Sequence, residues 1–312
     1  MLHLRIVSPA DRTARVQDLL CADPAACNVI VLPGAAVDPP GDVVLVDVAR
    51  EDGSVVVERL RALGIEHDGS IAVETVDTAI SAGATRAIAA ARGAPGDAVV
   101  WEQVEAKAAE EASLTWSYLG FLVLSSLMAA AALLTDSTIV LVGAMVLGPE
   151  FGPLAGVCVA VVQRRDAMLR RSLVALTAGF AVAIAVTYGF AELVFAFGWE
   201  PDAFSLQRGI ALLISSPDGW AVLVATCAGI AGMLSLTTAR SGALIGVLVS
   251  VTTLPAAAEV SLGAARGDWD ASGGAAAQLG VNVATILVVG IATLTFQRAA
   301  HARRRRRHDR GA

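Results

Sequence analysis

The chain has 312 residues, of which 55% are hydrophobic and only 17% are charged, and its mean hydropathy is +0.65. These values exclude an ordinary soluble domain and are typical of a protein with several membrane spans. Residues 1–112 hold eighteen acidic and nine basic residues, a net charge of −9, whereas residues 113–312 hold eleven and fourteen, a net charge of +3. The sequence therefore divides into an acidic soluble part and a membrane part. The four cysteines have no C-x-x-C spacing, so we expect no zinc site, no disulfide framework and no cofactor.

The first part of the chain alternates predicted strands and helices. The strand-like runs are residues 2–7, 28–32, 43–48 and 71–76, and the helical runs are residues 11–20 and 54–63. This β-α-β-β-α-β order predicts a cytoplasmic ferredoxin-like α+β sandwich over residues 1–78. That fold serves both as a packing or oligomerisation module and as a small-ligand sensor, and the sequence leaves both open. Prolines and glycines at 33–34 and 39–41 predict an irregular, exposed connection between the second and third strands.

A helical linker is expected over residues 79–112. An alanine-rich segment runs to about residue 92, a Gly-Ala-Pro-Gly sequence at 93–96 interrupts it, and a second helix starts at Asp97, a plausible N-cap. We expect the second helix to lie at the membrane surface, although Trp101 could instead pack within the soluble domain.

Six apolar runs follow, at about residues 114–134, 138–162, 173–197, 219–235, 241–264 and 275–297. Each approaches or exceeds the ~20 residues that cross ~30 Å of hydrocarbon, although the fourth is short. We therefore expect an all-α transmembrane domain over residues 113–297 and a basic tail over residues 298–312. The arginine run in the tail could bind nucleic acid, but an anchor attracted to anionic lipid is the simpler interpretation, so no nucleic-acid partner is expected.

The distribution of charge predicts the orientation of these runs. Arginines follow the second, fourth and sixth runs, whereas acidic residues dominate the other loops; the arginines are Arg164, Arg165, Arg170, Arg171, Arg240, Arg298 and Arg303 to Arg307. The positive-inside rule then places both termini in the cytoplasm. The first twenty residues lack the apolar core of a signal peptide, which agrees. We expect a multi-pass protein of the plasma (inner) membrane of a prokaryote. Interfacial aromatic anchors would be Trp116, Tyr118, Trp199, Trp220 and Trp269.

Prolines interrupt the second and fifth runs in similar contexts. The sequence S-T-I-V-L-V-G at 137–143 leads to Pro149 and Pro153, and R-S-G-A-L-I-G at 240–246 leads to Pro255. Each half would contain three spans, and an odd number inverts the second copy, so we predict a 3+3 inverted repeat with broken second and fifth helices. Pro149 and Pro255 lie about eleven and fourteen residues into their runs, near the midplane at ~1.5 Å per residue.

Candidate site residues gather at these interruptions. Glu150 lies inside the first, and Glu259 lies one turn after Pro255. A charged carboxylate at the bilayer centre costs about 2.5–3.5 kcal/mol, so each should face the bundle interior. Each could couple a proton or cation, or could be a protonated group that bonds a freed carbonyl or a neighbouring subunit. The residues expected to line an ion or substrate pathway are Gly148, Pro149, Glu150, Gly152, Pro153, Pro255, Glu259 and Asn282.

Other polar residues of the spans are weaker candidates. Glu192 is near enough to the outer end of its span to be interfacial, Gln207 and Arg208 lie between spans, and Asn282 could simply bond a neighbouring helix. The G-x-x-x-G sequence at 242–246 allows close helix contact within or between subunits, and we expect a homo-oligomer.

Three segments carry a family resemblance. The sequences L-L-T-D-S-T-I-V-L-V-G-A-M-V-L-G-P-E-F-G-P at 133–153, L-P-A-A-A-E at 254–259 and G-V-N-V at 280–283 resemble the bacterial and archaeal membrane family called domain of unknown function 389. The resemblance covers roughly residues 113–297 and implies a polytopic membrane protein without an assigned activity; the N-terminal region also resembles the small domain that many members carry. Glu150 and Phe151 depart from the mostly apolar residues of that family's break, and the second half lacks its double proline. An ion-coupling role for Glu150 would therefore belong to a subgroup.

Two functions fit these patterns. The leading expectation is a membrane transporter or channel for an ion or small solute, with a midplane site between the two interrupted helices. The alternative is a membrane-anchored sensor or assembly protein in which the N-terminal domain binds a ligand or partner. The chain has no H-E-x-x-H or G-x-S-x-G motif and its four histidines lie outside the membrane runs, so no enzymatic activity is expected.

Overall fold

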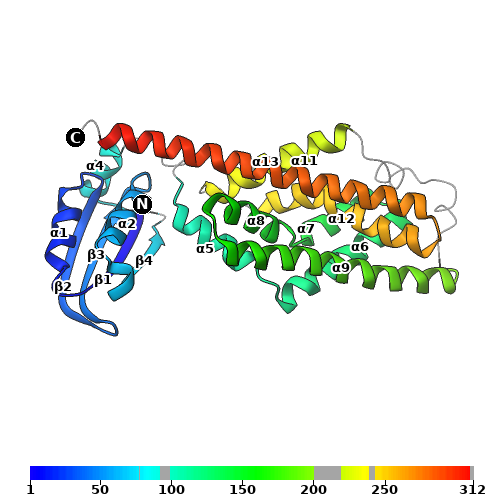
Figure 1. Ribbon diagram of the computed structural model, residues 1–312, viewed down its shortest axis with the longest axis horizontal. Helices are drawn as coiled ribbons and strands as arrows, with labels where there is room; N and C mark the ends of the chain where they lie inside the picture. The colour runs from blue at the N-terminus through cyan, green and yellow to red at the C-terminus, as the bar shows by residue number, and fades with distance from the viewer. Residues whose placement is uncertain (77, 92–98, 200–218, 239–242, 310–312) are drawn as a thin grey trace. The chain divides into compact units, whose positions relative to one another are not determined.

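The computed structural model describes residues 1–76, 78–91, 99–199, 219–238 and 243–309 (Figure 1). The chain separates into two compact units. One unit comprises Met1–Val104 with Thr237–Ala239, and the other comprises Glu105–Leu236 with Arg240–Ala312. We call them the N-terminal unit and the helical unit and describe each by itself.

The N-terminal unit contains one four-stranded antiparallel sheet. Its strands are β1 (Leu2–Ser8), β2 (Ala26–Val37), β3 (Pro40–Val48) and β4 (Ser70–Thr75), in the spatial order β2-β3-β1-β4. Helix α1 (Thr13–Ala22) joins the first two strands, and α2 (Gly53–Ala62) with the short α3 (Ile65–Asp68) joins the last two. The predicted β-α-β-β-α-β order is confirmed, with α3 as an addition.

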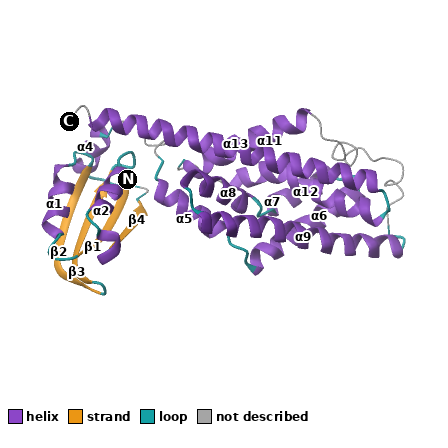
Figure 2. Ribbon diagram, viewed as in Figure 1, coloured by secondary structure: helices purple, strands orange, loops and turns teal. Residues whose placement is uncertain are grey.

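One face of the sheet carries the core of this unit. Leu2, Leu4 and Ile6 alternate along β1 and are buried, as a strand with one covered face requires. They belong with β3 to a cluster that includes Val16 and Leu20 of α1 and further residues of α2, Val56, Val57 and Leu60. Figure 2 shows these two helices beside the sheet.

The connection between β2 and β3 differs from the prediction. The turn itself is a short hairpin, because β2 continues to Val37 and β3 begins at Pro40, and the predicted irregular, exposed stretch lies within the paired strands. Pro33 and Gly34 form an irregularity within β2 instead: the pairing register shifts between Leu32 and Ala36, and the N–H of Gly34 bonds Oδ1 of Asp42 at 2.8 Å. An edge strand tolerates proline because its outer N–H groups have no strand partner.

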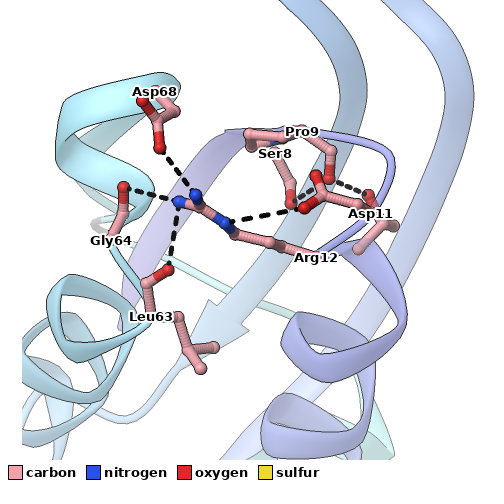
Figure 3. Close-up of polar contacts among 8 residues, drawn as sticks. Ser8, Pro9, Asp11, Arg12, Leu63, Gly64 and Asp68 are labelled. Atoms are coloured by element: carbon pink, nitrogen blue, oxygen red, sulfur yellow. Dashed lines mark hydrogen bonds and ion pairs between the residues drawn. The ribbon is translucent and has the colours of Figure 1, made fainter.

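Arg12 connects the start of α1 to the corner between α2 and α3 (Figure 3). Its Nη1 donates to the carbonyl oxygens of Leu63 at 3.3 Å and Gly64 at 3.2 Å, and its Nη2 pairs with Oδ2 of Asp68 at 2.7 Å. Gly64 has a φ of +75°, a conformation that glycine adopts without steric penalty. These contacts satisfy carbonyl groups that the end of α2 leaves open.

Two helices follow β4, namely α4 (Ala82–Ala90) and α5 (Trp101–Glu111). The side chain of Ser81 caps α4 by accepting a bond from the N–H of Ala84 at 2.9 Å. At the start of α5 the N–H of Trp101 donates to Oγ of Ser54 at 3.2 Å, within the N-terminal unit. This contact favours domain packing for Trp101 over a membrane anchor. Asp97 lies outside the described residues.

The helical unit consists of apolar helices. They are α6 (Trp116–Leu134), α7 (Thr138–Leu147), α8 (Phe151–Gln163), α9 (Asp166–Ala196), α11 (Gly219–Thr237), α12 (Ala243–Ala265) and α13 (Trp269–Asp309). Among the described residues, α6, α9, α11 and the part of α13 up to Ala300 are long and apolar enough to cross a membrane, and α7 with α8 makes a fifth span if the bent pair counts as one. The predicted six spans and inverted repeat stay predictions.

Only one of the two predicted breaks is present. Helices α7 and α8 are bent by 49° at the three residues between them. In contrast, α12 continues without interruption from Ala243 to Ala265 with Pro255 inside it, so the predicted break of the fifth helix is wrong. A proline in a helix interior removes one backbone bond and crowds the carbonyl one turn back, but it need not end the helix when packing compensates.

Helices α8 and α12 form the interior of this unit. Every residue from Gly152 to Ala160 in α8 is buried. Helix α12 packs against α6, α7, α9 and α13, and also contacts α8 (Figure 1). All four predicted interfacial tryptophans, Trp116, Trp199, Trp220 and Trp269, are exposed. The residues that interrupt α7 and α8 therefore lie beside the most enclosed helices of the unit.

Candidate functional site

The break between α7 and α8 is formed by Gly148, Pro149 and Glu150. Gly148 ends α7 with an extended ψ of 120°, and Glu150 is the N-cap of α8. The N–H of Gly152 donates to the carbonyl of Pro149 at 3.3 Å, and the N–H of Leu154 donates to the carbonyl of Glu150 at 3.3 Å. Pro153 lies in the first turn of α8, where its missing N–H does not interrupt the helix. The local sequence therefore ends one helix and starts the next within three residues.

The carboxyl group of Glu150 is completely buried at this break. Its Oε1 accepts a hydrogen bond from Oγ1 of Thr253 on α12 at 2.8 Å. Its Oε2 lies beside the hydroxyl of Ser250, a donor that acts on the carboxyl group although the contact falls outside strict hydrogen-bond geometry. Glu150 does not cap α8 with its side chain. The carboxyl group thus points across to α12 and keeps one oxygen available.

Gly148 makes this approach of the two helices possible. A Cβ atom added there would lie 2.5 Å from Oε2 of Glu150, 2.6 Å from Cδ1 of Leu254 and 2.7 Å from Oγ of Ser250. All three distances are shorter than a carbon atom tolerates. Gly148 therefore brings the carboxyl oxygen and the hydroxyl of Ser250 to the same small volume.

Gly152, one of the predicted pathway residues, also contacts the end of α5. A Cβ atom at this position would lie 2.5 Å from the carbonyl oxygen of Glu111, the last residue of α5. Gly152 therefore allows the end of α5 to approach the first turn of α8. Burial raises the pKa of the Glu111 carboxyl, and the nearby Lys107 opposes that shift.

A second polar group surrounds Pro255 on α12. The hydroxyls of Thr252 and Thr253 both bond the carbonyl of Val249, at 3.0 and 3.3 Å. Nδ2 of Asn282, on α13, donates to the carbonyl of Thr252 at 2.7 Å. Because Pro255 disturbs the backbone bonding of the preceding turn, this side-chain donor supports α12 where its own ladder is weakest.

The polar contacts continue from Asn282 along α13. Nε2 of Gln278 donates to Oδ1 of Asn282 at 3.4 Å, and both side chains are buried. Oε1 of Gln278 has no hydrogen-bond partner among the described residues. The two groups join through the adjacent residues Thr252 and Thr253, so Glu150, the Pro255 turn and Asn282 belong to one continuous polar region.

Tyr118 is a site residue that the sequence did not indicate. It was expected to be an interfacial anchor, but its side chain is buried on α6 and its hydroxyl has no partner in the described structure. It lies close enough to Glu150 for the carboxyl charge to act on the phenol group. Gly179 of α9 makes room for it, since a Cβ atom there would lie 2.8 Å from Oη. Helical spacing alone does not reveal which face of α6 meets α9.

The remaining candidates are more distant or lie elsewhere. Glu259 is buried on α12 but lies six residues beyond Thr253, about 9 Å further along the helix axis. Glu192 is exposed on α9, and Gln207 and Arg208 lie outside the described residues. The G-x-x-x-G segment at 242–246 also falls partly outside them. The structure therefore brings together the first break, the Pro255 turn and Asn282.

These observations define a class: a chain with several apolar helices, consistent with a membrane protein, around a buried carboxyl group at a helix break. Comparison with known families agrees. The family described as "Domain of unknown function (DUF389)" matches residues 145–288, and the chain is similar to this family over that region. The matched region begins just before the break and ends just after Asn282. Neither the curated proteins nor the solved structures gave a match.

Proposed function

We propose that the helical unit is a membrane transporter or channel for an ion or small solute, and that its pathway passes the break between α7 and α8 where this faces α12. One observation carries the proposal. Glu150 is fully buried among apolar helices, yet only one of its carboxyl oxygens has a described donor that meets hydrogen-bond geometry. Intramembrane ionisable residues are rare, and those that exist commonly belong to ion or substrate pathways.

The alternative of a purely structural carboxyl group is less well supported. Such a group would bond a freed backbone group near a proline or cap the helix that it begins. Glu150 does not cap α8, and its described donor is the hydroxyl of Thr253. Near Pro255 it is Asn282 that bonds the backbone. Bonding to the backbone next to a proline is therefore the role of Asn282 and not of Glu150.

The proposed arrangement in the membrane has six spans, with α12 as the span added to the five candidates and with both termini in the cytoplasm of a prokaryote. The positions of the arginines support this orientation. Many transporters bind their substrate near the midplane beside an interrupted helix, and the bent pair α7 and α8 is such a helix here. A homo-oligomer embedded in the plasma membrane is part of the same proposal.

Flux measurements in liposomes test this function. The full chain would be reconstituted and assayed with a panel of small solutes and ions, with a pH gradient of either direction. We expect flux in the wild type, a changed rate or coupling in Glu150→Gln, and no change in Glu192→Gln, which makes the same chemical change on the exposed side of α9. Indistinguishable behaviour of wild type and Glu150→Gln across the panel would count against the pathway.

A sensor or assembly role for the N-terminal unit is a second candidate, because one specific surface favours it. The face of the sheet opposite α1 and α2 carries two exposed apolar residues of the edge strand β2, Ile30 and Leu32. Beside them, Asp47 bonds Nδ1 of His3 at 2.8 Å and Nδ2 of Asn28 at 2.7 Å.

Thermal-shift screening of the full chain with metabolites and nucleotides tests sensing, with Ile30→Ser as the matched surface variant. A ligand-induced shift that Ile30→Ser abolishes is expected, and no shift with any compound argues against sensing.

A further inference from the structure

We infer that the break between α7 and α8 binds one monovalent cation, a proton or an alkali metal ion, at Oε2 of Glu150. This inference rests on the proposed function and deepens it by naming the class of ligand. It draws on three independent features of the site: the kind of atoms left without partners, the absence of basic side chains, and the state of the α8 N-terminus.

The buried atoms without a described partner around the break are oxygens. They are Oε2 of Glu150, Oη of Tyr118 and Oε1 of Gln278. Thr253 donates to Glu150 or Val249, Asn282 donates to Thr252, and the remaining hydroxyls beside the carboxyl, those of Ser250 and Tyr118, are neutral and supply no positive charge. A buried polar group without a partner is costly, so a ligand that accepts electron density from oxygen is the one that completes this site.

The elements around the break supply no positive charge. Helices α6, α7, α8 and α12 contain no lysine, arginine or histidine. The basic residues of α9 whose side chains are described, Arg170 and Arg171, are exposed, and so is Arg298 of α13. A carboxylate in low dielectric needs a counter-charge or a proton, and here neither comes from a side chain.

Other titratable groups near the break are few. The buried ones on the packed helices are Tyr118 on α6, Cys158 on α8 and Glu259 on α12, and none of them can carry a positive charge. On α9, Tyr188 and Glu192 are exposed, and Glu111 at the end of α5 is partly covered, with 39% of its side chain exposed. Glu150 is therefore the group of this region that a cation would neutralise.

The N-terminus of α8 would ordinarily attract an anion, because its N–H groups point outward. Here the first turn of α8 does not offer its N–H groups to an anion. The N–H of Gly152 bonds the carbonyl of Pro149, Pro153 has no N–H, and Glu150, an acidic residue, is itself the N-cap residue. The same positive helix end instead stabilises the Glu150 carboxylate when the proton leaves. The site is thus prepared for a negative carboxyl group and a mobile cation.

Infrared spectroscopy of the purified full chain in lipid nanodiscs tests the inference. The carbonyl stretch of a protonated carboxyl would be followed from pH 5 to pH 9 in choline chloride, and then with added NaCl, KCl or LiCl at constant ionic strength. We expect a protonated-carboxyl band in the wild type and in Glu192→Gln that is missing in Glu150→Gln. An alkali ion that competes for Oε2 should remove this band, and its apparent affinity should weaken about tenfold for each unit that the pH falls, because one ion displaces one proton.

Each outcome either supports or overturns the inferred cation site at Glu150. Loss of the band with an alkali ion supports the inference with that ion as the cation, and loss with rising pH alone supports it with the proton. A band that persists unchanged across all conditions, or one that Glu150→Gln retains, overturns it. If Glu150→Gln does not fold, a band that remains in Glu259→Gln excludes the other buried carboxyl of α12, and the response of that band to ions and pH decides. Cation binding without any flux in liposomes would instead refute the transport function, whereas flux insensitive to pH and alkali ions with an unresponsive band would refute only the cation site.

Discussion

The two proline sites of the helical unit look alike in sequence and differ in structure. At Gly148–Glu150 the chain leaves the helix and bends by 49°, whereas at Pro255 the helix continues. Before the break, Gly148 takes an extended conformation, and a second proline in α8 prevents a continuous ladder across it. Around Pro255 only one residue lacks an N–H, and alanines follow it.

Neighbouring side chains also contribute to the difference between the two proline sites. Asn282 donates to a backbone carbonyl in the turn before Pro255, so α12 stays helical with support from α13. The first break has no corresponding backbone support from Glu150, whose carboxyl group contacts Thr253. A proline in an apolar helix therefore forms a break, and with it a candidate site, only where the chain can leave the helix. Contacts with the neighbouring helices determine whether the chain leaves it.

Among the substitutions that test the difference between the two proline sites, Gly148→Ala is expected to have the largest effect on stability. The new methyl group would collide with Glu150, Ser250 and Leu254, so we expect a loss of about 1–3 kcal/mol in the free energy of unfolding in detergent. Gly143→Ala is the matched control on the same helix, because its Cβ would meet only Cε of Met128 at 3.6 Å. Equal stability of the two variants would mean that α7 and α12 are not in close contact at Gly148.

Removal of the support at Pro255 should have the next largest effect. Asn282→Leu deletes the donor to Thr252, and we expect a loss of about 1–2 kcal/mol, within the range of a buried hydrogen bond. Thr295→Val, on the exposed side of α13, removes only a bond to its own helix and serves as the control. Unfolding in detergent measures both, and an unchanged Asn282→Leu variant would show that α12 needs no outside donor.

A smaller effect is expected from Thr253→Val, which keeps the size of the side chain but removes the donor to Glu150. Hydrogen bonds between membrane helices contribute about 0.6 kcal/mol on average and up to about 1.7 kcal/mol. We expect a loss in that range together with a shift in the pH dependence of flux, because one donor to the carboxylate form is gone. Thr177→Val on α9 is the control, since its hydroxyl bonds only carbonyls of its own helix. A stability change without any change in the pH dependence would separate Thr253 from the site.

The smallest effect is expected from Pro255→Ala. Alanine restores the missing N–H in a helix that is already continuous, so we expect stability to rise by no more than about 1 kcal/mol. Combined with Asn282→Leu, it should reduce the loss caused by that substitution, and a double-mutant cycle measures the coupling. A large destabilisation by Pro255→Ala would contradict the view that this proline is merely tolerated.

Much of the fold follows from local patterns in the sequence. The alternation of Leu2, Leu4 and Ile6 predicts a strand with one covered face, and the succession of short runs predicts the order of elements in the sheet. The hairpin at β2–β3 was missed because the glycine and proline at 33–34 indicate a turn, whereas an edge strand can hold them as a bulge. Pairing between strands competes with local turn propensity, and here the pairing dominates.

Of the candidate site, the sequence by itself determined the two positions at the break that have no N–H, Pro149 and Pro153, because proline lacks this group whatever packs around it. It also placed Glu150 in that break. Only the tertiary structure decided that Thr253, Ser250 and Tyr118 meet this carboxyl group, and that Asn282 supports Pro255. Helical periodicity defines the face on which a residue lies, but which faces meet depends on the close packing of all the helices, and small residues such as Gly148 and Gly179 set that packing at positions far apart in the chain.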